Sequence, residues 1–245
     1  MTTETPRKRM VRPPVGGSDV GRGRAERLRT AKSHSPSSQA WLERQLNDPY
    51  VAEARARGYR SRAAFKLIEI DDRLHLIRRG ARVVDLGCAP GGWLQVLVER
   101  GAGLVVGVDL LETAPLAPAR VLQGDFTEPG LQARLLAQVG GAVDVVLSDL
   151  APNTTGHRRT DHLRIVGLIE AAADFAEHGL APGGAFVAKA FQGGETAAVI
   201  ASLRRRFGQV RLVKPKASRA GSAEIYVACT GFRGSSTCSP ATPTP

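Results

Sequence analysis

Two lysines and two carboxylates occupy positions where a charge is costly. Lys189 ends the apolar run AFVA, and a lysine among buried residues is expensive unless a carboxylate pairs with it. Asp149 follows a second apolar run, Glu224 opens a third, and Lys66 has apolar neighbours in a helical pattern. Two converging lysines shielded from water disfavour each other's charge, so one amine could accept a proton from a weakly acidic hydroxyl. The alternative is a structural ion pair of Lys189 and Glu224.

A glycine-rich turn provides a candidate binding site. The segment VVDLGCAPGGW from Val83 has the pattern of a buried strand that runs into a turn and opens a helix. Ligands of open α/β sheets bind beyond the carboxyl ends of the strands, so we expect Asp85, Gly87, Pro90 and Gly92 at a binding site. The G-x-G-x-x-G spacing of dinucleotide sites is absent, and a proline poorly suits a turn whose N–H groups cradle a pyrophosphate.

Acidic residues surround this turn and indicate the kind of ligand. Asp85 and Asp109 end the first and second predicted strands, and Asp125 and Phe126 follow the third. Carboxylates match a sulfonium cofactor that carries a cationic amine and ribose hydroxyls, and they would repel a pyrophosphate. We expect Asp109 to accept the ribose hydroxyls and Asp125 to face the adenine edge, with Phe126 beside the ring. The pattern predicts S-adenosyl-L-methionine as the cofactor.

Apolar runs and helical patterns alternate from Ser61 onward, which is typical of an α/β fold with a doubly wound, mostly parallel sheet. We predict seven strands, at Arg82–Leu86, Leu104–Asp109, Arg120–Gln123, Val143–Ser148, Gly184–Ala190, Val210–Lys214 and Glu224–Thr230. The predicted helices are Ser61–Leu76, Gly92–Arg100, Gly130–Val139, Asp161–His178 and Glu195–Phe207. Pro182–Gly184 should form a tight turn into the fifth strand.

The ends of the chain have a different character. Residues 1–38 and 234–245 are rich in Gly, Pro, Ser and Thr without apolar periodicity, so we expect a disordered basic extension and a disordered tail. Residues 39–60 should be a basic helical lead-in, broken at Asn47–Pro49. Residues 61–233 then form the catalytic domain, and 245 residues suffice for one such domain.

Composition and charge limit the classes of binding partner and the cellular location that we expect. The net charge is +11, of which residues 1–62 hold +8 (14 Lys and Arg against 6 Asp and Glu). Such a basic end favours a polyanion, although a solvated tail is the alternative. No apolar run approaches the roughly 18 residues of a membrane span, so we expect a cytoplasmic protein. The three cysteines lie far apart without a metal-binding spacing, so we expect neither a disulfide nor a metal site.

Six segments resemble the bacterial large-subunit ribosomal RNA uridine 2′-O-methyltransferase family, often called FtsJ or RlmE. They are SRAAFKLIEI from Ser61, VVDLGCAPGGW from Val83, LQGDF from Leu122, SDLAPNTTG from Ser148, LAPGGAFVAKAFQG from Leu180 and SRAGSAEIYVACTG from Ser218. The resemblance implies a Rossmann-like class I methyltransferase fold. It also implies catalysis by Lys66, Asp149, Lys189 and Glu224, with Lys189 as proton acceptor, and cofactor binding by Gly91, Trp93, Asp109, Asp125 and Asp149.

The resemblance further implies the substrate. It points to the ribose 2′-hydroxyl of a uridine in the A loop of the large ribosomal subunit. The sequence leaves the oligomeric state open, and a monomer is the default expectation. Lys214, Lys216 and Arg219 either line the RNA groove or are merely solvated. Cys88 stands where relatives carry a small residue such as alanine, and the basic N-terminal extension is longer than the family needs.

Two alternatives remain open from the sequence. One is 2′-O-methylation of another RNA, such as transfer RNA or an mRNA cap, although cap recognition needs aromatic residues and only 5% of this chain is aromatic. The other is a non-catalytic ribosome-assembly factor on the same scaffold, which would carry a broken set of four charged residues or a broken glycine turn.

Overall fold

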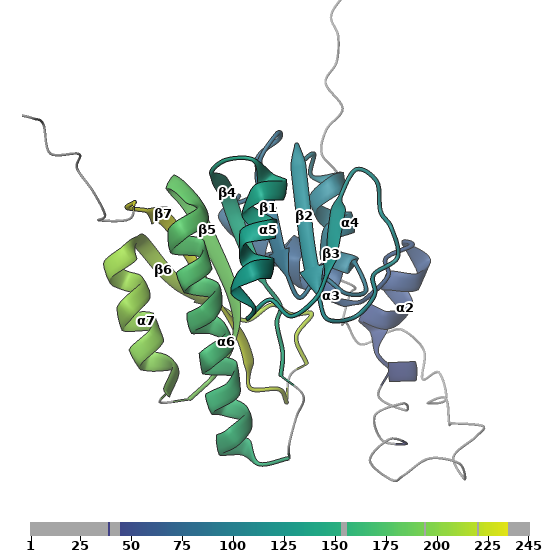
Figure 1. Ribbon diagram of the computed structural model, residues 1–245. Coiled ribbons are helices and arrows are strands. Elements are labelled where there is room, and N and C mark those ends of the chain that lie inside the picture. The colour runs from purple at the N-terminus through teal and green to yellow at the C-terminus, as the bar shows by residue number, and fades with distance from the viewer. Residues whose placement is uncertain (1–38, 40–44, 153–155, 194, 220, 235–245) are drawn as a thin grey trace, which may run out of the picture.

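The computed structural model describes residues 39, 45–152, 156–193, 195–219 and 221–234 (Figure 1). Residues 1–38 and 235–245 lie outside the described residues, so the disorder expected at both ends stays a prediction. The division of the chain into extension, lead-in, catalytic domain and tail stays a prediction as well.

One sheet of seven strands forms the centre of the described part of the chain, in the order β3-β2-β1-β4-β5-β7-β6. Strands β3 to β5 run parallel, and β7 lies antiparallel between β5 and β6. This confirms the predicted α/β fold with a mostly parallel sheet. The strands are β1 Arg82–Leu86, β2 Leu104–Asp109, β3 Arg120–Gln123, β4 Val143–Ser148, β5 Leu180–Phe191, β6 Phe207–Val213 and β7 Glu224–Phe232.

Helices cover both faces of the sheet, because its central strands are apolar on both sides (Figure 1). Val83 and Val145 pack in one buried cluster with α2, α3 and α4, whereas their neighbours Val84 and Val146 pack in another with α5, α6 and α7. Successive residues of a strand point to opposite faces, which accounts for this division. The helices are α2 Pro49–Ala56, α3 Ala63–Leu74, α4 Gly92–Glu99, α5 Pro129–Val139, α6 Arg158–Gly179 and α7 Glu195–Arg206.

The strand order places the candidate site. From β1 the chain winds outward through β2 to β3, and then returns to add β4 on the other side of β1. The carboxyl ends of β1 and β4 therefore flank a topological switch point, where open α/β sheets bind their ligands. No described helix is long and apolar enough to cross a membrane.

Several boundaries differ from the sequence prediction. The sequence predicts that the fifth strand begins after a turn at Pro182–Gly184, whereas β5 begins at Leu180 and includes these residues. The turn is present as an irregularity within β5, because Gly183 has a φ of 81° and the pairing with β4 shifts register between Val143 and Val145. Gly184 fits this irregular segment because a Cβ atom there would lie 2.8 Å from the Ala181 carbonyl oxygen. The predicted α7 ended at Phe207, but Phe207 is buried and begins β6.

The predicted break in the lead-in is confirmed. Asp48 is the N-cap of α2, where its side chain accepts a hydrogen bond from the Tyr50 backbone N–H, and Pro49 is the first helical residue. The chain leaves α2 at Arg57 and reaches α3 only at Ala63, two residues later than predicted. The intervening segment contacts the glycine-rich turn, as described below.

Candidate active site

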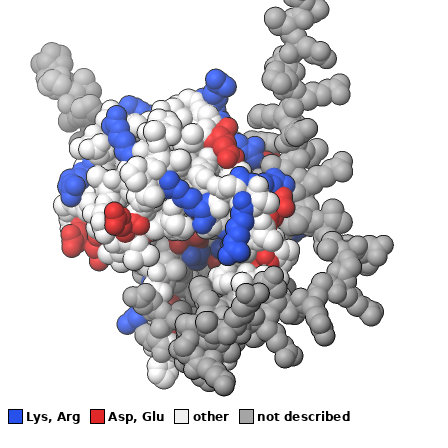
Figure 2. Space-filling model, turned by 90° about the vertical axis from the view of Figure 1, so that its right-hand side faces the viewer, with Lys and Arg blue, Asp and Glu red and all other residues white. Residues whose placement is uncertain are grey.

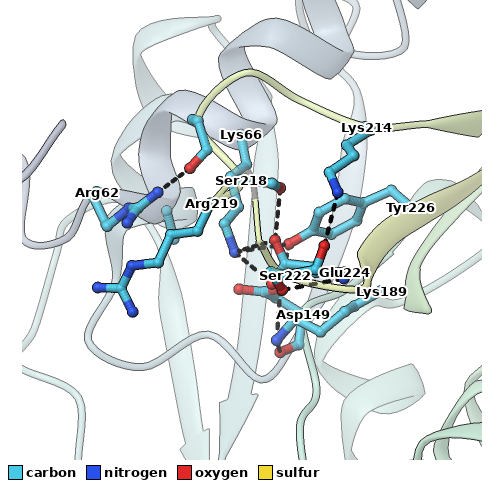
Figure 3. A network of polar contacts seen from close by, with 12 residues as sticks. Arg62, Lys66, Asp149, Lys189, Lys214, Ser218, Arg219, Ser222, Glu224 and Tyr226 are labelled. Atoms are coloured by element: carbon cyan, nitrogen blue, oxygen red, sulfur yellow. Dashed lines mark hydrogen bonds and ion pairs between the residues drawn. The ribbon is translucent and has the colours of Figure 1, made fainter. Parts of the chain in front are cut away.

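The four charged residues singled out in the sequence lie together at the carboxyl edge of the sheet (Figure 3). Lys66 projects from α3, Asp149 follows β4, Lys189 lies near the end of β5, and Glu224 begins β7. Lys66 Nζ lies 2.8 Å from Glu224 Oε1, and Lys189 Nζ lies 2.9 Å from Asp149 Oδ1. Lys189 Nζ also donates a hydrogen bond of 2.8 Å to the Asp149 backbone oxygen. The predicted residues therefore form two adjacent ion pairs.

Tyr226 connects the two pairs. Its hydroxyl donates a 2.6 Å hydrogen bond to Asp149 Oδ1 and accepts one of 3.3 Å from Lys66 Nζ. Burial, followed by the charge of Asp149, raises the pKa of the Tyr226 hydroxyl well above its ordinary value, so it remains a donor. Sequence reasoning missed this residue because a tyrosine in an apolar strand reads as core. The available signal was its spacing of two from Glu224, which places both side chains on one face of β7.

The loop before β7 holds Glu224 in place. Ser218 Oγ donates a 2.7 Å hydrogen bond to Glu224 Oε1, and Ser222 Oγ accepts one of 3.1 Å from the Glu224 backbone N–H. Lys214 Nζ in turn donates to the Ser222 backbone oxygen at 2.7 Å (Figure 3). The carboxylate that pairs with Lys66 is thus fixed from its own strand and from the preceding loop.

All four charged side chains are largely shielded from water. Their exposed fractions are 10% for Lys189, 12% for Lys66, 14% for Glu224 and 16% for Asp149. Charges this deeply placed are tolerated only when partners and hydrogen bonds compensate for lost hydration.

The glycine-rich turn after β1 is bound to the end of β2. Asp109 Oδ2 accepts a 2.9 Å hydrogen bond from the Ala89 backbone N–H, and Oδ1 accepts one of 2.9 Å from Leu111. Asp109 thus supports the turn, although each oxygen keeps a further lone pair for a ligand. Gly87 has a φ of 82°, and a Cβ atom there would lie 3.0 Å from the Leu150 backbone nitrogen.

The same turn packs tightly against the start of α3. A Cβ atom at Gly92 would lie 2.4 Å from Ser61 Oγ, and the Trp93 indole N–H donates a 2.8 Å hydrogen bond to the Ala63 backbone oxygen. These glycines therefore allow the protein's own segments to approach one another, and the predicted ligand contacts of Gly87, Pro90, Gly91 and Gly92 stay a prediction. Through this packing the turn sets the position of the helix that carries Lys66. The predicted cofactor contact of Trp93, which is buried, stays a prediction.

Arg60 ties the turn to the loop after β2. Its guanidinium donates hydrogen bonds to the backbone oxygens of Pro90, Ala114 and Pro115, at 3.3, 2.6 and 2.8 Å. Gly91, with a φ of 107°, leaves room for this arginine, because a Cβ atom would lie 2.6 Å from Arg60 Nη1.

A cavity of about 330 Å³ lies beside the ends of β2, β3 and β4. Asp125 accepts hydrogen bonds from the side chain and backbone of Thr127, which lower the pKa of the Asp125 carboxyl and favour its charged form. Phe126 is buried and packs edge-on against Phe175, so its ring belongs mainly to the core. The cavity is lined by Val108, Asp109, Leu110, Gly124, Asp125, Phe126, Thr127, Leu150, Ala151, Pro152, Arg164, Gly167 and Leu168.

Asp85, near the end of β1, has no hydrogen-bond partner among the described residues. It is fully buried, and neither carboxyl oxygen makes a hydrogen bond. Burial, followed by the charges of Asp149 and Asp109, raises the pKa of Asp85 well above its ordinary value. A buried polar group without a partner is rare and calls for a ligand, a water or a neutral state.

Two further observations concern other kinds of site. A larger cavity of about 540 Å³ opens at the opposite edge of the sheet, beside Arg78, Arg79 and Asp144, away from the two ion pairs. Within the described ranges, no group of three or more His, Cys, Asp and Glu side chains could hold a metal ion.

Comparison with known proteins places the chain in a family. Residues 59–232 match the FtsJ-like methyltransferase family. The ribosomal RNA large subunit methyltransferase E of Caulobacter sp. (strain K31) is 62% identical over 92% of this chain and 100% of its own length. The enzyme of that name from Acidiphilium cryptum (strain JF-5) is 60% identical over 85% of this chain and 93% of its own length.

A solved structure agrees with these relatives. A Plasmodium falciparum protein described as a ribosomal RNA methyltransferase superimposes with a TM-score of 0.66 at 30% identity, covering 72% of this chain and all of that one. The family match over residues 59–232 includes the glycine-rich turn and both ion pairs of the candidate site. The chain therefore belongs to the FtsJ-like methyltransferase family.

Proposed function

We propose that this methyltransferase moves the methyl group of S-adenosylmethionine to a ribose 2′-hydroxyl in large-subunit ribosomal RNA, at a uridine of the A loop, in the cytoplasm. One observation carries the proposal. Two shielded lysine–carboxylate pairs, bridged by Tyr226, lie near a cavity that holds Asp109 and Asp125, at the switch point of the sheet. The relatives' names supply the RNA, because they describe large-subunit ribosomal RNA methyltransferases.

The residues around the cavity fit such a cofactor. Its carboxylates, Asp109 and Asp125, match ribose hydroxyls and an adenine amino group, and the unpartnered Asp85 could receive a donor or a positive charge. Glycines at positions 87 and 91 keep the adjoining turn compact. When bound, the sulfonium supplies an electrophilic methyl group whose transfer requires only an oxygen nucleophile.

The protein's own residues then position and deprotonate that oxygen. In this proposal Lys189 acts in its neutral amine form: it accepts the hydroxyl proton and becomes the ammonium that pairs with Asp149, while Asp149, which accepts a hydrogen bond from Tyr226, fixes its position. Lys66, paired with Glu224, lies on the other side of Tyr226 and holds the hydroxyl in line. Alignment of oxygen, methyl carbon and sulfur contributes to the rate independently of the proton transfer.

The charge of the chain supports an RNA substrate. The net +11 is concentrated in residues 1–62, and each basic group placed on a phosphate adds affinity that does not depend on sequence. Figure 2 shows the described face beside α4 and β3, where Lys and Arg stand in several separate places with Asp and Glu among them. On the described part of this face the basic side chains do not form one continuous patch.

Replacing Lys189 by Met should abolish methyl transfer. The variant keeps the length of the side chain but cannot accept a proton, so we expect a loss of at least about 100-fold in rate. The assay follows labelled methyl from S-adenosylmethionine into large ribosomal subunits isolated without this modification, with naked RNA in parallel.

Cofactor affinity, measured by calorimetry, is the control and should stay near the wild-type value. A Lys189→Met protein that methylates at the wild-type rate would refute the assigned role. Labelling of transfer RNA in place of the subunit would support the first alternative, in which the enzyme methylates another RNA. Absence of any labelling by the wild type would favour an assembly factor.

Replacing Tyr226 by Phe should lower the turnover number by roughly 10- to 150-fold, because a hydrogen bond to a charged group contributes roughly 1.5–3 kcal/mol. The ring still packs against Trp93, so the KM for the subunit and the cofactor affinity should not change. Tyr59→Phe is the matched control, because it removes a 2.6 Å hydroxyl–carboxylate bond to Glu99 away from the site. Equal turnover of both variants would contradict the bridging role.

Replacing Asp85 by Asn should change how stability depends on pH. Because the folded protein raises the pKa of Asp85, it binds a proton that the unfolded chain releases above about pH 4. Wild-type stability should therefore fall as the pH rises through this window, whereas the variant avoids that loss. In urea unfolding of the cofactor-free protein, the free energy of unfolding of Asp85→Asn should rise relative to that of the wild type from pH 5 to pH 8.

Asp144→Asn, an exposed carboxyl at the other edge of the sheet, should retain the wild-type pH dependence. A constant difference between Asp85→Asn and wild type across this range would show that Asp85 is ionised when folded.

A further inference from the structure

A second pocket opens next to the Lys66–Glu224 pair. Its volume is about 210 Å³, and its lining comes from the lead-in before α3, from α3 and from the loop before β7. The cavity beside Asp109 and Asp125, in contrast, is lined by Leu150, the residue that follows Asp149. The second pocket is lined by Gln45, Arg62, Ala63, Lys66, Arg219, Ser222 and Glu224.

This pocket holds more positive than negative charge. Arg62 and Arg219 share one carboxylate, because Arg62 Nη1 and Arg219 Nε, the latter at 3.5 Å, both pair with Asp48 Oδ2. Lys66 is balanced by Glu224. The five charged groups therefore sum to +1, which matches the single negative charge of a phosphodiester.

Arg62 is held in place but not fully satisfied. Its Nη2 donates to the Ala217 backbone oxygen, whereas its buried Nε has no acceptor among the described residues. Burial lowers the pKa of Arg62, and the charge of Arg219 adds to this effect. A buried N–H without a partner costs stability, and an anion in the pocket would offset the unfavourable burial of the Arg62 charge.

Arg219 occupies the more open side of the pocket. Its side chain is 38% exposed, against 15% for Arg62, so it can turn toward a ligand while Arg62 keeps Asp48 in place. Guanidinium groups bind phosphate oxygens through paired, charge-assisted hydrogen bonds. Figure 3 shows both arginines on the Lys66 side of the network.

We propose that the pocket of Arg62 and Arg219 binds the phosphodiester on the 3′ side of the ribose that is methylated. This inference rests on the proposed function. In RNA the 3′ oxygen and the 2′-hydroxyl occupy adjacent carbons of the same ribose, so a phosphate in this pocket holds the hydroxyl beside Lys66 and the bridging Tyr226. Asp48 keeps the two guanidiniums together before the RNA arrives. The pocket thereby fixes the direction in which the RNA strand crosses the site.

Arg219→Gln tests the proposal with the full-length protein and unmethylated large subunits. We expect the KM for the subunit to rise about tenfold, because one charge-assisted contact is lost. The turnover number at saturation and the cofactor affinity should stay within about twofold of wild type. The slope of log KM against log salt concentration should fall by about one, the signature of one lost phosphate contact. Arg219→Lys, which keeps the charge, should retain the slope with a smaller change in KM.

Arg78→Gln is the matched control, since Arg78 is an exposed arginine at the opposite edge of the sheet. It should leave KM and the salt slope unchanged. If Arg219→Gln methylates with the wild-type KM and slope, or if Arg78→Gln changes both as much, the phosphate pocket is refuted while the proposed function stands. Failure of the wild-type protein to methylate the subunit would refute the proposed function instead.

Discussion

The pairing of two lysines with two carboxylates in a site nearly closed to water is the constraint on which the rest of this structure depends. A single unpaired charge at this depth would cost several kcal/mol, so each group requires its partner in place. Tyr226 makes the two pairs one unit, because its hydroxyl contacts Asp149 and Lys66 together. The four charged groups are therefore held in place by partners within the protein itself, and alignment of a hydroxyl with a methyl donor requires such fixed positions.

The fold meets this constraint by bringing distant segments to one edge of the sheet. Strand β7 runs antiparallel to β5, and its register places Tyr226 directly opposite Lys189. The glycine-rich turn packs on the start of α3 and so sets the position of Lys66 along the edge of the sheet. The glycine-rich turn and the helix that carries Lys66 are thus joined through the Trp93 indole and the Ala63 backbone oxygen.

Much of this arrangement could be predicted from the sequence, because charges at the ends of apolar runs are conspicuous. Lys189 and Glu224 stood out for this reason, and the period of strands and helices gave the seven-stranded sheet. Tyr226 could not be separated from a core residue, since its role depends on which partners face it. The sharing of Asp48 by Arg62 and Arg219 was equally hidden, because it joins residues more than 150 positions apart.

The chemical identity of the methylated group tests the central claim most directly. Large-subunit RNA labelled by the wild-type protein can be hydrolysed with alkali, which cleaves beside every free 2′-hydroxyl. The account predicts that the label appears in a single alkali-resistant dinucleotide, because a 2′-O-methyl group blocks cleavage. Label released in a mononucleotide would show methylation of a base, and would contradict the assignment of the two lysine–carboxylate pairs to a ribose hydroxyl.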